Sequence, residues 1–122
     1  MMIRFSWGSG RMTVNPDALI RDMPMSNYRK WVKLFARYGR PEDHELMFQL
    51  LGDYIISGKD VVAEWQANVN EWTWKAEGQI MTNFTKRHCR GQLRLAQKHL
   101  NGANHRLKRY QTMYDLLKGL MS

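Results

Sequence analysis

Apolar residues occupy every second position from Ile3 to Trp7, and the same alternation resumes after a Gly-Ser-Gly turn. A period of two on both sides of a glycine-containing turn predicts a small β-hairpin over residues 2–14. An isolated hairpin is only marginally stable in water. We therefore expect residues 1–14 to be an accessory to a larger fold.

From Asn15 onward the apolar residues recur every three or four positions, which is typical of amphipathic helices. Asn15 and Pro16 are typical of a helix start, and Pro24 must end the short helix that they begin. Longer helices are predicted over residues 26–38, 41–57, 61–90 and 104–119. Their expected caps are Ser26, Asp60 and Asn104, and their expected ends are Gly39, in a left-handed conformation, Gly58 and Gly102. The predicted fold class is mainly α: a helical bundle of about five helices with a small N-terminal β-hairpin.

The apolar stripe of the long fourth helix changes phase near its end. Leu93, Ala96 and Leu100 fall on a different side of an ideal helix from the preceding stripe. Either the helix breaks near Gly91 or it meets a different packing partner there. We expect one core that contains Leu50, Tyr54, Trp65, Val69, Trp72, Ile80 and Phe84.

Composition limits the class of protein. The chain has 122 residues, of which 43% are hydrophobic and 25% charged, and it has one cysteine. These values predict a single folded domain over residues 1–122 and exclude both a disordered tail and a disulfide-rich miniature. No stretch approaches the roughly 18 apolar residues of a membrane span, and no signal peptide is expected at the N-terminus. The lone cysteine suits a reducing compartment, so we expect the cytoplasm.

The net charge of +8 is concentrated in one part of the sequence. No acidic residue lies between Glu77 and Asp115, and residues 86–109 form a basic segment. Its eight bases are Lys86, Arg87, Arg90, Arg94, Lys98, Arg106, Lys108 and Arg109. Four of them, Lys86, Arg90, Arg94 and Lys98, recur every four residues and form a stripe on a helix that phosphates could follow. Like charges at this spacing repel one another, and an anionic partner removes that cost. The segment therefore predicts phosphate-backbone contacts to DNA or RNA.

Aromatic side chains provide a second candidate contact. Trp65 and Trp72 fall on the expected buried stripe and are interpreted as core residues. Trp74, two positions further on, points to the other side of the helix. It is a candidate for stacking on bases or for contact with a protein partner.

The sequence offers no convincing catalytic or metal site. His44 and Glu45 resemble the start of a zinc-protease motif, but Phe48 occupies the position of its second histidine. Cys89 has histidines nearby in the sequence, His88, His99 and His105, yet their spacing matches none of the common zinc sites. We expect no enzyme activity, no metal and no cofactor.

These observations favour a non-enzymatic nucleic-acid-binding accessory protein or small subunit of a nucleoprotein complex. Its expected partners are nucleic acid and other protein subunits, with no membrane and no small-molecule substrate. The alternative is a small inhibitor or assembly chaperone, of the type that phage and mobile elements encode, which acts through protein contacts alone.

Overall fold

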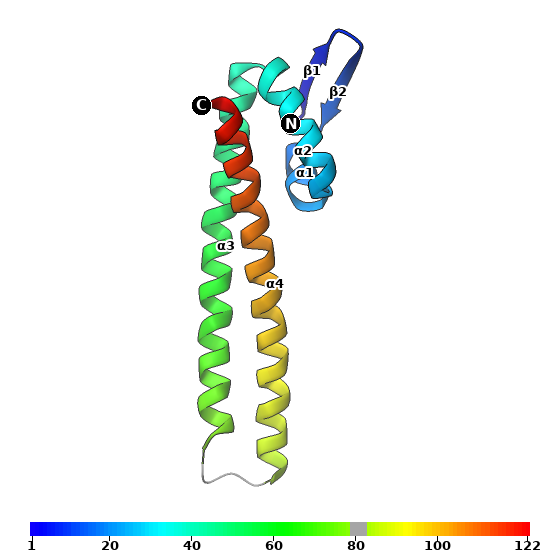
Figure 1. Ribbon diagram of the computed structural model, residues 1–122. Helices are drawn as coiled ribbons and strands as arrows, with labels where there is room; N and C mark the ends of the chain where they lie inside the picture. The colour runs from blue at the N-terminus through cyan, green and yellow to red at the C-terminus, as the bar shows by residue number, and fades with distance from the viewer. Residues whose placement is uncertain (79–82) are drawn as a thin grey trace. The chain divides into compact units, whose positions relative to one another are not determined.

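A computed structural model of the chain describes residues 1–78 and 83–122, without the side chains of residues 83 and 84, and the described part is mainly helical. Its elements are β1 (Ile3–Trp7), β2 (Gly10–Val14), α1 (Pro16–Asp22), α2 (Met25–Tyr38), α3 (Pro41–Ala76) and α4 (Asn83–Met121) (Figure 1). The fold class is as predicted, but four helices are found where about five were expected. The residues cluster into two compact units. The first unit comprises residues 1–55 and 109–122, and the second comprises residues 56–108.

The N-terminal hairpin of the first unit has the predicted two antiparallel strands. Phe5 pairs with Met12 in the ladder, and Trp7 pairs with Gly10 beside the turn. A Cβ atom on Gly10 would lie 3.0 Å from the Trp7 ring, so the absence of a side chain leaves room for the indole. Ile3 and Phe5 are buried and form part of the hydrophobic core of the first unit.

The starts of α1 and α2 differ in how well the sequence predicts them. The Asn15 side chain accepts hydrogen bonds from the backbone N–H groups of Asp17 and Ala18, at 3.0 and 3.4 Å, and Pro16 opens α1 as expected. The predicted Ser26 cap of α2 is wrong. Pro24 is the residue before the first helical position, so α2 already begins at Met25. Proline suits this place because its fixed φ angle is compatible with helix entry.

Gly39 ends α2 as predicted, but for a different physical reason. Its backbone is extended, with φ −69° and ψ 156°, so the expected left-handed conformation is wrong. A Cβ atom at this position would lie 2.5 Å from the carbonyl oxygen of Phe35. That oxygen accepts hydrogen bonds from the Gly39 N–H at 2.8 Å and from Nε2 of His44 at 2.7 Å. Glycine is needed here because the backbone turns back closely on α2.

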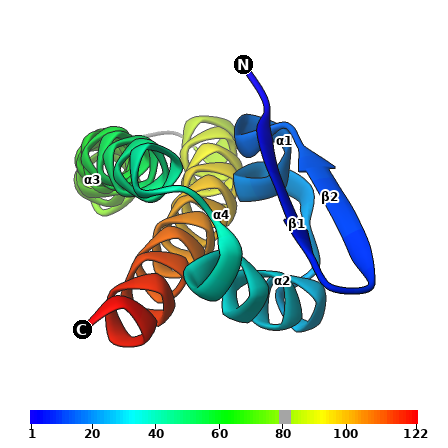
Figure 2. The ribbon, with the colours of Figure 1, turned by 90° about the horizontal axis from the view of Figure 1, so that it is seen from above.

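The core of the first unit combines residues from the hairpin, α1, α2, the start of α3 and the end of α4. Figure 2 looks down on this unit and shows α1 and α2 beside the hairpin. The rings of Trp31 and Phe35 stack with their centroids 4.6 Å apart. The buried hydroxyl of Tyr28 donates to the carbonyl of Met113 at 2.7 Å, which ties α2 to α4. Burial raises the pKa of Tyr28 above its ordinary value, with the charge of Arg109 opposing the rise, so the hydroxyl keeps its proton for this bond.

Several predicted helix boundaries are wrong in α3 and α4. Gly58 and Asp60 lie inside α3, and Gly102 and Asn104 lie inside α4. The expected helix over residues 61–90 is also wrong, since α3 ends at Ala76 and α4 starts at Asn83. A single glycine inside a helix costs only about 1 kcal/mol, which packing by its neighbours can offset. Helix α3 instead ends at Ala76, shortly before Gly78.

The single core expected for residues of α3 and α4 is not found either. Leu50 and Tyr54 pack against the core of the first unit. Trp65, Val69 and Trp72 belong to the second unit and are half-buried. Ile80 lies outside the described residues, and the side chain of Phe84 is not described.

Candidate nucleic-acid interface

In the second unit, α3 and α4 run antiparallel and meet along a seam. The Trp65 ring stacks on the His99 ring at a centroid distance of 4.4 Å, and the Trp72 ring meets the His88 ring edge-on at 6.0 Å. The later residue of α3 thus contacts the earlier residue of α4, as expected for antiparallel helices. Seam positions alternate in steps of three and four residues on both helices, the heptad pattern of a coiled coil. On α3 they are Gly58, Val62, Trp65, Val69, Trp72 and Ala76, and on α4 they are Cys89, Leu93, Ala96, Leu100, Ala103 and Leu107.

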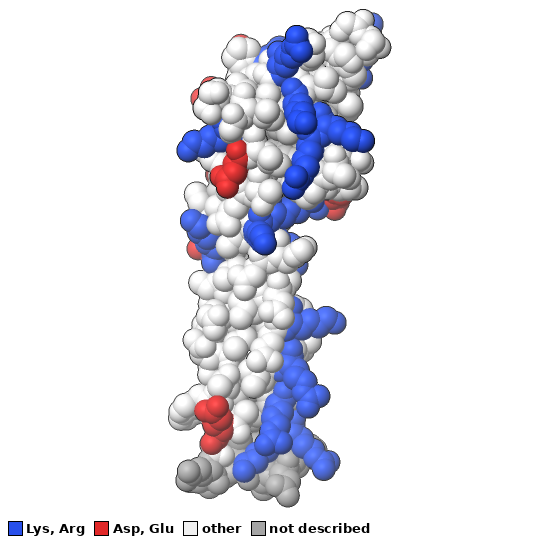
Figure 3. Space-filling model, viewed as in Figure 1, with Lys and Arg blue, Asp and Glu red and all other residues white. Residues whose placement is uncertain are grey.

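A straight strip of polar residues lies on one flank of α4, because each of its members from Arg90 onward follows a seam residue directly. At about 100° per residue, the strip lies roughly a quarter-turn from the seam along its whole length. We call the following residues the α4 strip: Arg87, Arg90, Arg94, Gln97, Asn101, Asn104 and Lys108. All seven are exposed, and none is acidic or apolar. In Figure 3, Lys and Arg side chains gather along the α4 edge of the second unit.

The three arginines of the α4 strip are electrostatically uncompensated. None of them forms an ion pair with any residue that the structure describes. Arginine side chains donate in a planar fork that matches phosphate oxygens, and the amides of Gln97 and Asn101 can donate to phosphates or to base edges. The strip spans about 30 Å at 1.5 Å per residue, so several consecutive phosphates could contact it.

The structure divides the four bases of the predicted stripe among different faces of α4. Arg90 and Arg94 lie in the α4 strip. Lys86 takes a seam position and is half-buried, whereas Lys98 lies on the ridge furthest from the seam. A four-residue repeat drifts relative to a seam that repeats every 3.5 residues, by about 50° per step. Arg87 and Lys108, which are not part of the four-residue repeat, do lie in the α4 strip.

Arg106 and Arg109 lie away from the α4 strip. Arg106 follows the opposite flank of α4, the one that carries His88 and His99. Arg109 belongs to the first unit, where its guanidinium donates to the carbonyls of Ile20 at 2.8 Å, Leu19 at 3.2 Å and Met23 at 2.5 Å. These carbonyls stand at the end of α1, where a helix leaves acceptors without internal partners. Arg109 is thus engaged in holding α1, and we leave it out of the interface.

Trp74 is exposed as expected, with 77% of its surface accessible. Two positions beyond the seam residue Trp72, it points away from α4. Trp74 and the α4 strip therefore do not form one continuous binding face. Lys75 covers the Trp72 ring instead, with its ammonium nitrogen 4.7 Å from the ring centroid.

The cysteine and histidines that the sequence offered as metal ligands do not form a metal site among the described residues. Cys89 is buried in the seam, with 3% of its surface exposed. Across residues 1–78 and 83–122, no three His, Cys, Asp or Glu side chains are grouped closely enough to hold a metal ion. In the same residues no helix has the length and apolar content to cross a membrane.

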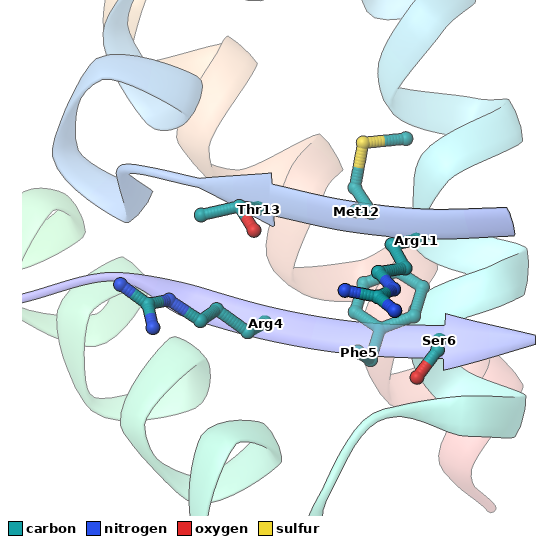
Figure 4. Close-up of a pocket in the computed structure, with 6 residues that line it drawn as sticks. All are labelled: Arg4, Phe5, Ser6, Arg11, Met12 and Thr13. Carbon is teal, nitrogen blue, oxygen red and sulfur yellow. The ribbon is translucent and has the colours of Figure 1, made fainter.

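The hairpin carries a feature that the sequence analysis missed. Its outer face forms a shallow pocket of about 340 Å³, lined by Arg4, Phe5, Ser6, Arg11, Met12 and Thr13 (Figure 4). In the strand register Arg4 faces Thr13 and Arg11 faces Ser6, which sets two guanidinium groups and two hydroxyls on one exposed surface. The alternation of these residues is visible in the sequence, but alternation by itself indicates only strands, and the strand register is needed to place the four side chains together.

Comparison with protein-family models, with curated proteins and with solved structures finds no match to this chain.

Proposed function

We propose that this protein is a non-enzymatic nucleic-acid-binding protein, an accessory factor or small subunit of a nucleoprotein complex, that follows a phosphate backbone with the α4 strip. The observation that carries the proposal is the alignment of exposed, uncompensated arginines with amides along one straight flank of α4. Backbone contacts of this kind give affinity without strong sequence preference. The expected ligand is DNA or RNA.

A salt titration of the full chain tests the proposal. The strip variant carries Arg87→Gln, Arg90→Gln and Arg94→Gln. The control variant carries Arg4→Gln, Arg11→Gln and Arg21→Gln, which removes the same charge from three exposed sites on the hairpin and α1 of the first unit. Binding to a labelled DNA duplex and to a single-stranded RNA is measured by fluorescence anisotropy at several salt concentrations.

The parent is expected to show a steep loss of affinity with salt. For the strip variant, the slope of log K against log salt should become shallower by about three on DNA, close to one per phosphate contact removed. The control variant should keep the slope of the parent. If the strip and control variants bind alike, the strip is a solvated face and the proposal fails.

The second candidate function is a protein-only inhibitor or assembly chaperone. It is favoured by one observation, the exposure of Ile56 and Trp74 on α3, at 63% and 77%. Large exposed apolar side chains are common at protein contacts. This candidate gains if the parent binds neither DNA nor RNA with any dependence on salt.

A further inference from the structure

Helix α2 in the first unit has two faces of opposite character. One face is buried in the core through Tyr28, Trp31, Val32 and Phe35. The opposite face carries a second set of bases, which we call the α2 face: Arg29, Lys30, Lys33 and Arg37, all exposed. At about 100° per residue these four fall within roughly 100° of arc around the helix.

The bases of the α2 face are not paired with acids among the described residues. Helix α2 contains no acidic residue. Arg29 and Lys33, and again Lys33 and Arg37, stand four positions apart, where like charges destabilise a helix. Within the described residues none of the four bases forms an ion pair, and Arg37 instead lies over the Tyr38 ring, 5.3 Å from its centroid.

Two acids of the neighbouring elements have partners outside α2. Asp43, at the start of α3, pairs with Arg40 at 3.2 Å. Asp17 in α1 accepts a hydrogen bond from the Tyr54 hydroxyl at 3.1 Å. In Figure 3, Lys and Arg side chains of the first unit gather over α2. The α2 face is therefore a second concentration of positive charge, separate in sequence from the basic segment.

We propose that the α2 face is a second phosphate-backbone contact, so that the protein holds nucleic acid through both of its units. That the polyanion is a nucleic acid rests on the function proposed above. Two linked contacts raise the overall affinity beyond that of either one, because the second binds at a high effective concentration. From Arg29 to Arg37 the face extends about 12 Å, enough for two or three phosphates.

A membrane surface is a poorer partner for this helix. An amphipathic helix binds lipid by inserting its apolar face between the headgroups. The apolar face of α2 is occupied, since Tyr28 and Phe35 have no exposed surface. Insertion would require the core of the first unit to open, whereas phosphates can approach the basic face without any rearrangement.

The test adds two proteins to the salt titration. The face variant carries Arg29→Gln, Lys33→Gln and Arg37→Gln, and the combined variant adds the three changes of the strip variant to these. The slope of log K against log salt should become shallower by about two to three in the face variant, and the combined variant should lose most of its salt-dependent binding. Circular dichroism and thermal unfolding should match the parent, because all the altered side chains are exposed.

The outcomes separate this inference from the proposed function. If the face variant binds like the control variant while the strip variant loses affinity, the α2 face is only solvated and the inference is overturned. If the strip variant instead behaves as the control while the face variant loses affinity, the contact proposed for α4 fails and the α2 face remains as the contact. A rescue variant with Arg29→Lys and Arg37→Lys keeps the charge and should retain most of the parent's affinity. Loss of binding in this rescue variant would contradict a backbone contact made through charge.

Discussion

The two units are stabilised in different ways. In the first, large side chains from five elements are completely buried, among them Phe35, Met47 and Met113. In the second, the buried side chains among the described residues are small ones at seam positions of α4, and the large tryptophans Trp65 and Trp72 on α3 are half-exposed. A pair of helices cannot enclose a large side chain from all sides, so small seam residues are buried more fully than large ones.

This difference explains why the second unit displays long rows of polar residues. In the second unit, the exposed residues of α4 can carry functional groups without disturbing the packing at the seam, as those of the α4 strip do. In the first unit, the helices and the hairpin each bury one face in the core, so only their outer faces have the same freedom. The first unit is therefore expected to set the stability of the protein, and the second to be tolerant of substitution.

The largest expected effect tests this comparison directly. Phe35→Ala should lower the free energy of unfolding by about 3–5 kcal/mol, since it leaves a cavity in a fully packed core. Trp72→Ala, at a half-buried seam position, should cost only about 1–2.5 kcal/mol despite the larger side chain. Urea titrations followed by circular dichroism measure both. Equal losses would show that the seam is packed as tightly as the core.

The sequence predicted the first unit better than the second, for a physical reason. Local signals mark Asn15, Pro16 and Gly39, because each must meet a requirement of the backbone at a helix end. The glycines of α3 and α4 are ambiguous in sequence: the same residue type ends one helix and lies inside another. The continuing three-and-four spacing of apolar residues past Gly58 and Gly102 was the better guide.

The candidate site shows the same limit. The basic segment was visible as a run without acids, but its division among faces depends on the seam, and the seam is set by the partner helix. Counting in steps of four selected Lys86 and Lys98, which the structure places on other faces than Arg90. No local pattern could indicate that Arg109 binds carbonyls of α1, some ninety residues away. The four bases of the α2 face are visible in the sequence, but only the structure shows that they form no ion pair with any residue it describes.

A second prediction concerns the hydrogen bond between Tyr28 and Met113. Tyr28→Phe keeps the ring but leaves the buried carbonyl without its donor, which should cost about 1–2 kcal/mol. The change should also alter the dependence on pH. Burial raises the pKa of Tyr28 in the folded state, so its contribution is complete below about pH 10, the pKa of an unfolded tyrosine, and is lost as the pH rises further.

The free energy of unfolding of the parent should therefore fall above pH 10 more steeply than that of the Tyr28→Phe variant. Tyr54, whose pKa is also raised, is present in both proteins and does not affect the difference. Denaturant titrations at neutral pH and at two alkaline values give the comparison. Parallel curves for parent and variant would mean that the Tyr28 hydroxyl is accessible to solvent.

The smallest expected effect tests the continuity of α4. If Gly102 lies inside a helix, Gly102→Ala should stabilise the protein by about 0.5–1 kcal/mol, because alanine loses less backbone freedom on folding. The space allows the substitution, since the nearest atom to a Cβ there is Nη1 of the flexible Arg106 side chain, at 3.4 Å. If Gly102 instead ended a helix in a left-handed conformation, alanine would be strained and the protein destabilised. The sign of the change in a urea titration thus decides between one continuous α4 and two shorter helices. Gly91→Ala, at an exposed position of the same helix with no atom within 4 Å of the added Cβ, serves as the matched control and should stabilise by a similar amount.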